Sequence, residues 1–128
     1  MERDSPAAGR WPQRLYLVRH GQSQGNVARD KSEAAGLATI GIDMRDVDVP
    51  LSELGHRQAA ATGRWFAGRP DDERPEVILS SPYLRARQTA RAICEAGGLA
   101  GGRARTVVDE RLREREFGVF DGLTTLGI

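Results

Sequence analysis

The sequence predicts an α/β fold built on a mostly parallel sheet. Three short apolar runs, at residues 15–18, 77–79 and 105–108, are too short for helices and are typical of buried strands. Helical patterns lie between them, and strand–helix–strand connections within one sheet are right-handed and parallel. The 128 residues suit one domain that is long enough to bury a core.

Composition narrows the classes of function. Nineteen basic and 18 acidic residues leave a formal charge of +1, and no basic block indicates a nucleic acid or a membrane as partner. The single cysteine, Cys94, excludes an internal disulfide and a cysteine-rich metal site, and its apolar surroundings favour a buried structural thiol. Without a bilayer-spanning stretch or a signal peptide, we expect a cytoplasmic protein.

The amino-terminal residues separate into a tail and an opening strand. Residues 1–13 carry charges, prolines and a glycine without any period, which predicts a flexible tail before a domain of residues 14–128. The apolar run at 15–18 should then deliver Arg19 and His20 to the carboxyl end of a strand, where open α/β sheets bind ligands.

The residues after this strand suit a phosphoryl group. A neutral imidazole, here His20, can attack phosphorus, and the neighbouring Arg19 guanidinium can hold two phosphoryl oxygens. Gly21 lets the backbone approach an anion closely, and Asn26 can donate a hydrogen bond to it. The alternative is that His20 is a hydrogen-bonded residue at a strand end without any chemistry.

A long connection and a helix follow. Residues 27–48 show little periodicity and predict a short helix within a loop over the site, either a lid or specificity element or an ordinary surface insertion. Ser52 is a plausible N-cap for a helix over residues 53–67. Its apolar face is predicted to hold Leu54, Ala61 and Trp65.

The second strand, at 77–79, should pass straight into another helix. Ser81 can cap this helix, Pro82 can occupy its first position, and Gly97 and Gly98 end it. Its free N–H groups would face the carboxyl edge of the sheet and attract anions. Its buried stripe is predicted to hold Ala86, Ala90, Ile93 and Cys94, which leaves Arg85 off the stripe.

Three segments resemble motifs of the histidine phosphatase superfamily, the phosphoglycerate mutase-like group. Residues 19–26 resemble its opening Arg-His-Gly-x-Ser-x-x-Asn motif, and residues 50–59 resemble its Pro-Leu-Thr/Ser-x-x-Gly-x-x-Gln-Ala helix start. Within the latter, His56 falls where the motif asks for no particular residue, so we interpret it as a surface residue. The resemblance implies a three-layer α/β/α fold with a mostly parallel sheet.

Residues 81–90 resemble the family's Ser-x-Leu-x-Arg-Ala-x-Gln-Thr-Ala segment, which implies that Arg85, not Arg87, binds the phosphate. Otherwise Arg85 would be a solvated helix arginine. Residues 112–122 resemble the segment Leu-x-Glu-x-x-x-Gly-x-x-x-Gly, which implies that Glu114 is the general acid and base. The alternative is that Glu114 and Glu116 are surface charges paired with the arginines at 111, 113 and 115.

Together the residues and the resemblance predict a phosphomonoester hydrolase or phosphoryl transferase. His20 would carry a phosphohistidine, Arg19, Asn26 and Arg85 would bind the phosphoryl oxygens, and Glu114 would move the proton. No cofactor is expected, and two histidines in separate segments give no zinc spacing. The substrate would be a phosphorylated small molecule or a phosphoprotein. The alternatives are a phosphoglycerate mutase and a non-catalytic module that binds phosphate or phosphoproteins.

One departure from the family concerns the end of the chain. Members carry a second histidine late in the domain, whereas this sequence has none after His56. We therefore expect the chain to be the N-terminal part of a histidine phosphatase domain, truncated at the C-terminus. The alternatives are that another chain supplies the missing part or that the protein is a degenerate phosphate binder. Part of the sheet would stay exposed, which favours a marginal folding unit or a homo-oligomer.

Overall fold

The computed structural model describes residues 11–99, 104–115 and 122–127. Three α-helices lie in these ranges: α1 (Gln24–Ala34), α2 (Glu53–Ala67) and α3 (Leu84–Gly97). The strands are β1 (Val77–Ser80) and β2 (Arg105–Val108). Three short 3₁₀ helices join them: η2 (Asp46–Asp48), η3 (Asp71–Glu73) and η4 (Glu110–Leu112). The chain is therefore mixed α/β in these ranges, as predicted.

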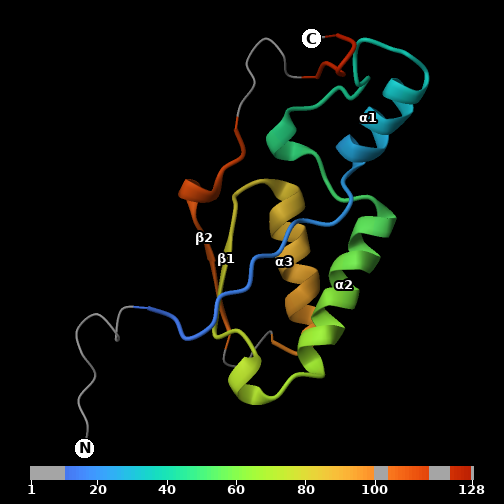
Figure 1. The fold of residues 1–128 in the computed structure, drawn as a ribbon. Coiled ribbons are helices and arrows are strands. Elements are labelled where there is room, and N and C mark those ends of the chain that lie inside the picture. Colours follow the sequence, from blue (N-terminus) through green and yellow to red (C-terminus); the bar gives the residue numbers. More distant parts are fainter. Residues whose placement is uncertain (1–10, 100–103, 116–121, 128) are drawn as a thin grey trace, which may run out of the picture.

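The two strands form a parallel pair connected through α3. Val77 lies opposite Arg105 and Ser80 opposite Val108, which confirms the strands predicted at 77–79 and 105–108. Figure 1 shows α3 packed beside the sheet and α2 beyond it, while α1 and η2 lie past the carboxyl ends of the strands. From these ends the chain continues into α3, which carries Arg85, and into η4, which precedes Glu114.

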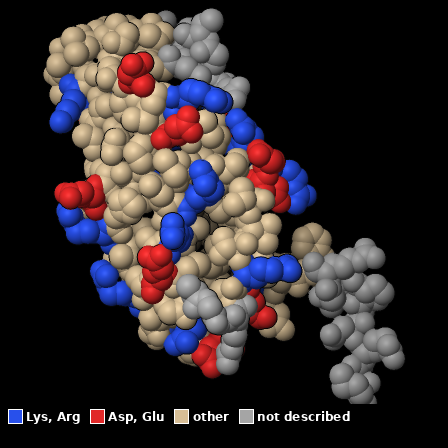
Figure 2. All heavy atoms as spheres, turned by 180° about the vertical axis from the view of Figure 1, so that it is seen from behind, with Lys and Arg blue, Asp and Glu red and all other residues tan. Residues whose placement is uncertain are grey.

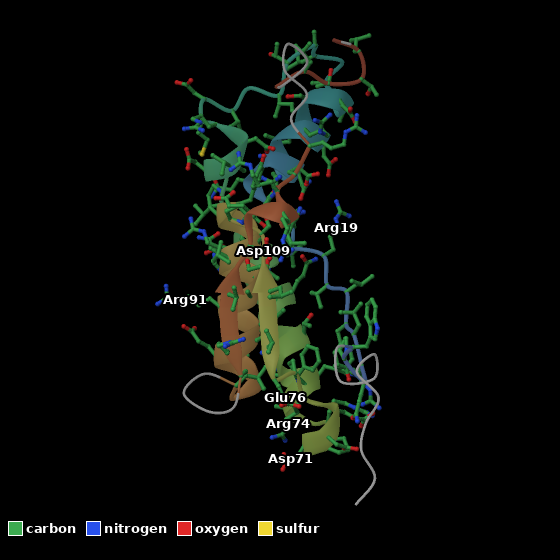
Figure 3. All side chains as sticks on the ribbon, turned by 90° about the vertical axis from the view of Figure 1, so that its left-hand side faces the viewer. Arg19, Asp71, Arg74, Glu76, Arg91 and Asp109 are labelled. Atoms are coloured by element: carbon green, nitrogen blue, oxygen red, sulfur yellow. The ribbon has the colours of Figure 1, made fainter. Side chains whose placement is uncertain are left out.

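Residues 15–18 are not a buried strand, so this prediction is wrong. The segment forms no strand ladder within the described ranges, and Leu17 is 90% exposed. In Figure 3 it runs on the side of β1 away from β2, where a third strand would lie. Tyr16 fixes it instead, because its ring packs on Phe66 at 5.0 Å and its hydroxyl donates to the Glu73 carbonyl at 2.8 Å. One aromatic anchor replaces a ladder of backbone hydrogen bonds.

Helix α2 has the predicted limits but buries a different face. Ser52 caps it as expected, because its hydroxyl accepts from the Gly55 N–H at 3.1 Å. Leu54, Ala61 and Trp65 are exposed, contrary to the prediction. The buried residues are instead mostly small: Gly55, Ala59, Gly63 and Phe66. Small side chains let two helices approach closely. Helix α2 therefore packs through its small residues and not through the larger apolar residues of the predicted face.

Helix α3 begins later than predicted and buries Arg85. Its N-cap is Tyr83 rather than Ser81, although the Ser81 hydroxyl does accept from the Tyr83 N–H at 3.2 Å. It ends at Gly97, and Gly98 takes the left-handed conformation (φ 66°) that favours glycine. Arg85 is only 7% exposed. The prediction that Arg85 lies off the buried stripe is therefore wrong, whereas Ile93 and Cys94 are buried as expected.

The core lies between α2 and α3, and the opposite face of the sheet is open. The buried cluster holds Ala59, Phe66, Ile93, Cys94 and Leu99, with Ile78 of β1 packed against it. Val77 and Leu79 point to the other face of β1, where Leu79 is 57% exposed. This confirms the expectation that part of the sheet stays exposed.

The surface has no single dominant charge on the face that Figure 2 shows, where basic and acidic side chains are interspersed. Surface ion pairs such as Arg91–Glu95, at 3.2 Å, join neighbouring turns of a helix. Among the described residues, no helix combines the length and the apolar character needed to cross a bilayer.

Candidate active site

His20 lies at the end of the amino-terminal coil with one ring nitrogen engaged. Its Nδ1 is 2.7 Å from the carbonyl oxygen of Gly21. A carbonyl oxygen can only accept a hydrogen bond, so Nδ1 carries the proton. In the neutral ring this leaves Nε2 unprotonated. The contact therefore selects the tautomer in which Nε2 has the lone pair that a nucleophile needs.

The backbone around His20 is fastened to both helices of the core. The Gly21 N–H donates to the Thr89 hydroxyl of α3 at 3.1 Å, and that hydroxyl donates to the Arg85 carbonyl at 2.7 Å. A Cβ at Gly21 would lie 2.4 Å from the carbonyl oxygen of Gly55 in α2. Gly21 thus permits close packing on α2, and the approach of an anion to its backbone stays a prediction.

A capping box orients Asn26. The Ser23 hydroxyl accepts from the Asn26 N–H at 3.0 Å, and Asn26 Oδ1 accepts from the Ser23 N–H at 2.9 Å. This reciprocal pair begins α1 and occupies the acceptor end of the Asn26 side chain. The amide NH₂ of Asn26 remains as a donor for a ligand oxygen.

Arg85 is the buried cation of the site. Its Nη1 donates to the Asp46 carbonyl at 2.8 Å and to Asp46 Oδ1 at 3.0 Å. Its guanidinium carbon lies 4.9 Å from the centre of the Tyr83 ring. Buried charges need such partners, because desolvation would otherwise be costly. These contacts contradict the alternative of a solvated arginine, whereas Arg87, two residues further along α3, is exposed.

Glu114 faces the same guanidinium from another segment. Its Oε2 lies 3.7 Å from Arg85 Nη2, and half of its side-chain surface is exposed. The 3₁₀ helix η4 leads to it from β2, and Asp109 caps η4 by accepting from the Arg111 N–H at 2.9 Å. Glu114 therefore lies beside a phosphate-binding candidate and open to solvent. Glu116, the other carboxylate considered, lies outside the described residues.

A cavity of about 570 Å³ brings the predicted residues together. All five line it: Arg19, His20, Asn26, Arg85 and Glu114. Arg19 is exposed, and Figure 3 shows its side chain on the side of the coil away from the sheet. His56, by contrast, is an exposed residue of α2, as expected.

The lining also contains charged residues that sequence analysis missed. Arg29, Arg45 and Arg113 bring its arginines to five, against the two carboxylates of Asp46 and Glu114. This surplus of guanidinium groups suits an anionic ligand. Asp46 and Arg45 belong to the loop predicted as a lid or surface insertion, where no local pattern marked them. No group of three or more potential metal ligands occurs within the described ranges.

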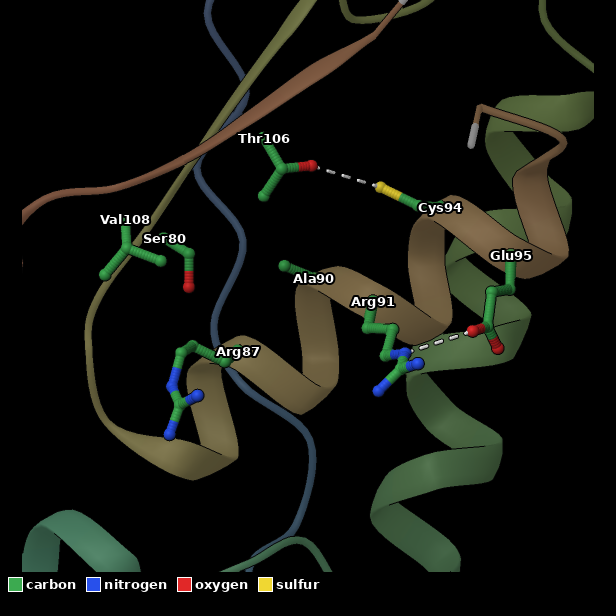
Figure 4. Close-up of a pocket in the computed structure, with 8 residues that line it drawn as sticks. All are labelled: Ser80, Arg87, Ala90, Arg91, Cys94, Glu95, Thr106 and Val108. Carbon is green, nitrogen blue, oxygen red and sulfur yellow. Dashed lines mark hydrogen bonds and ion pairs between the residues drawn. The ribbon is translucent and has the colours of Figure 1, made fainter. Parts of the chain in front are cut away.

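A second, smaller cavity of about 350 Å³ lies between α3 and β2 (Figure 4). Its lining combines Ala90, Cys94 and Val108 with polar and charged residues, and Cys94 Sγ lies 3.8 Å from the Thr106 hydroxyl within it. Arg91 and Glu95 pair with each other at its edge. It contains none of the five predicted residues, so the larger cavity is the candidate active site.

The sequence is similar to those of known proteins. The family model of the histidine phosphatase superfamily (branch 1) matches residues 15–128. A fructose-2,6-bisphosphatase TIGAR B from Danio rerio is 37% identical over 84% of this chain and 36% of its own length. A 2,3-bisphosphoglycerate-dependent phosphoglycerate mutase from Chelativorans sp. is 37% identical over 85% of this chain and 45% of its own.

Solved structures give the same picture. A mycobacterial glucosyl-3-phosphoglycerate phosphatase, in a complex with VO3, superposes with a TM-score of 0.56. It is 34% identical and covers 83% of this chain, which corresponds to 41% of the mycobacterial chain. The chain spans between 34% and 45% of the length of the curated relatives compared with it.

Proposed function

The chain belongs to the histidine phosphatase superfamily (branch 1) and shares its α/β fold with a parallel sheet, and on that premise we propose that it is a phosphomonoester hydrolase. The observation that carries this proposal is the single cavity lined by Arg19, His20, Asn26, Arg85 and Glu114. Its reaction would pass through a phosphohistidine on His20.

The first step transfers the phosphoryl group to His20. The Nε2 lone pair attacks phosphorus while the bond from phosphorus to the leaving oxygen breaks. Glu114 in its acid form gives its proton to that oxygen, which leaves as an alcohol. Arg19, Arg85 and the Asn26 amide neutralise and position the phosphoryl oxygens, which supplies most of the catalysis in phosphoryl transfer.

The second step returns the site to its starting state. Glu114, now a carboxylate, takes a proton from water, and the water oxygen attacks phosphorus. The bond between phosphorus and Nε2 breaks, inorganic phosphate leaves, and Nε2 regains its lone pair. A second alcohol in place of water would make the same site a mutase, and the Chelativorans relative is named as a phosphoglycerate mutase.

We further propose the setting in which this chemistry occurs. The substrate is a phosphorylated small molecule or a phosphoprotein, which the surplus of arginines in the cavity supports. Residues 14–128 form the N-terminal part of a histidine phosphatase domain, supported by the partial coverage of the relatives. The protein acts in the cytoplasm, and its exposed sheet face supports a homo-oligomer.

Hydrolysis of p-nitrophenyl phosphate in EDTA tests this function. We expect His20→Ala to reduce turnover by about a thousandfold or more, because the attacking group is lost. His56→Ala is the matched control, since His56 is exposed on α2 and should retain full activity. Circular dichroism checks the folding of each protein.

Equal turnover by the folded His20→Ala variant and the wild-type chain would contradict phosphohistidine chemistry. A folded wild-type chain that binds phosphate but hydrolyses nothing would favour the non-catalytic module instead. Either result would be visible in the same set of proteins, with phosphate binding followed by ³¹P NMR.

A further inference from the structure

Asp46 contacts the buried guanidinium of Arg85 through both its backbone and its side chain. The Asp46 carbonyl accepts from Nη1 at 2.8 Å, Oδ1 accepts from Nη1 at 3.0 Å, and Oδ2 lies 3.5 Å from Nη2. These two residues are 39 positions apart in the sequence. The loop before α2 is therefore attached directly to the residue proposed to bind phosphate.

The loop that carries Asp46 is itself held in place. Asp46 begins η2, and its carbonyl also accepts from the N–H of the buried Val49 at 3.2 Å. The following residues are bonded to α1 and α3: the Pro50 carbonyl accepts from the Gln24 N–H at 2.9 Å, and the Leu51 N–H donates to Gln88 Oε1 at 2.8 Å. Asp46 is thus a fixed partner for Arg85.

The other edge of the same guanidinium, formed by Nε and Nη2, includes the nitrogen that lies near Glu114. Nη2 lies 3.7 Å from Glu114 Oε2, and Nε makes no hydrogen bond to any described residue. The Tyr83 ring packs against the guanidinium at 4.9 Å and restricts its tilt. Nη1 of Arg85 is therefore held by the loop at short distances, whereas Nη2 makes only the longer contacts with Asp46 Oδ2 and Glu114 Oε2, so the Nε–Nη2 edge can still meet a ligand.

Resting on the proposed function, we propose that Asp46 is a positioning residue that clamps Arg85 so that its Nε–Nη2 edge meets the phosphoryl group. A guanidinium binds two oxygens only in one plane, so fixing that plane beforehand reduces the entropy lost on binding. The backbone carbonyl contact favours this role over one in which Asp46 competes with the ligand for Arg85, because rotation of the Asp46 side chain does not remove the contact.

If Asp46 instead competed with the phosphoryl group for Arg85, its removal would have the opposite effect on anion binding. Removing any carboxylate near the cavity should strengthen binding of an anion, because repulsion is lost. Removing a clamp should weaken it. Asp48 supplies the control, since it lies in the same 3₁₀ helix, is exposed and has no hydrogen bond or ion pair with Arg85 among the described residues.

The test measures the dissociation constant of inorganic phosphate by ³¹P NMR for the full chain and four variants: Asp46→Asn, Asp46→Ala, Asp48→Asn and Asp48→Ala. The clamp predicts that Asp46→Ala binds phosphate about tenfold more weakly than Asp48→Ala, the size expected for one charge-assisted contact. Asp46→Asn should lie between, because its amide oxygen still accepts from Nη1. Equal or tighter binding by the Asp46 variants would overturn the clamp.

A spectroscopic measurement keeps the proposal testable if Asp46→Ala folds poorly. Slow rotation about the guanidinium bonds separates the ¹⁵N signals of the two Nη atoms, and the signals of Arg85 can be identified by their loss in Arg85→Lys. We expect separate signals in the wild type and in Asp48→Asn, and signals that merge at a lower temperature in Asp46→Asn, which keeps the backbone contact but loses the charge. The same merging temperature in Asp46→Asn and Asp48→Asn would overturn the clamp.

Failure of the clamp and failure of the proposed function give different results. If all Asp46 and Asp48 variants bind phosphate alike while His20→Ala loses turnover, the clamp fails and the proposed function stands. If phosphate binding depends on Asp46 but His20→Ala turns over normally, the clamp stands and the phosphohistidine fails. A wild-type chain that binds no phosphate would overturn the clamp.

Discussion

The two faces of β1 differ sharply in how they are covered. Ile78 packs against the buried cluster between α2 and α3, where Phe66 is only 3% exposed. Leu79, the next residue along the strand, points to the opposite face and is 57% exposed. The covered face anchors His20 through Thr89 and Gly21. The site therefore depends on one packed interface, although a parallel sheet normally has two.

Truncation of Phe66, on the covered side, should give the largest difference in stability between the two faces of β1. Phe66→Ala leaves a cavity in the core and removes the ring that anchors Tyr16. We expect it to lower the free energy of unfolding by about 3 to 4 kcal/mol. Leu79→Ala on the open face should change it by less than about 0.5 kcal/mol. Urea unfolding measures both, and equal losses would contradict the contrast.

A single methyl group at Gly63 should show how closely α2 and α3 pack. A Cβ at Gly63 would lie 2.5 Å from the backbone carbonyl oxygen of Ile93. Helix propensity alone predicts that Gly63→Ala stabilises the protein by about 1 kcal/mol. We expect a loss of about 2 kcal/mol instead, because the helices must separate.

Gly68→Ala, at the end of α2, is the matched control for Gly63→Ala. Its Cβ would meet neighbouring atoms at ordinary van der Waals distances, 3.6 Å or more. It should therefore change the free energy of unfolding by less than about 0.5 kcal/mol. A stabilising Gly63→Ala would show that α2 and α3 pack less tightly than described.

The smallest effect on stability should come from protonation of Asp109, which follows β2 (Figure 3), at low pH. The side-chain hydrogen bond from Arg111, with its backbone N–H, lowers the pKa of Asp109 from 3.8 to about 2. A lowered folded-state pKa stabilises the fold above pH 4, and this contribution is lost as the pH falls through about 2. The apolar contacts on the covered face of β1 contribute a stability that does not depend on pH in this way.

Asp109→Asn should therefore reduce the loss of stability between pH 5 and pH 2, compared with the wild type. Urea unfolding at the two pH values measures the difference. The effect should be small and should diminish in high salt, because the Arg111 side chain is almost fully exposed to solvent. An identical acid response in both proteins would mean that this pair does not stabilise the segment leading to Glu114.

Sequence reasoning succeeded where local patterns and motifs decide the structure. The start of α2 followed from the N-cap Ser52, although the face predicted to be buried was wrong, and Gly98 marked the end of α3. Both β1 and β2 were found as short apolar runs. The five proposed site residues came from motif spacing, and the structure brings them to one cavity.

Sequence reasoning failed where packing between segments far apart in the chain decides the structure. The run at 15–18 has the composition of a strand, but a strand also requires a paired neighbour, and no described strand pairs with it. The buried face of α2 follows Gly55, Ala59 and Gly63 because close helix packing selects small residues. The Asp46–Arg85 contact joins segments far apart in the chain, so no local pattern could show it.

Detection of the phosphoryl group on His20 tests the central claim most directly. The chain is mixed with p-nitrophenyl phosphate, denatured within milliseconds in alkali, where phosphohistidine is stable, and digested for mass spectrometry. We predict an added phosphoryl group on the peptide that contains His20, and none in His20→Gln. Turnover without any phosphoryl group on His20, or with the group on His56, would contradict the account.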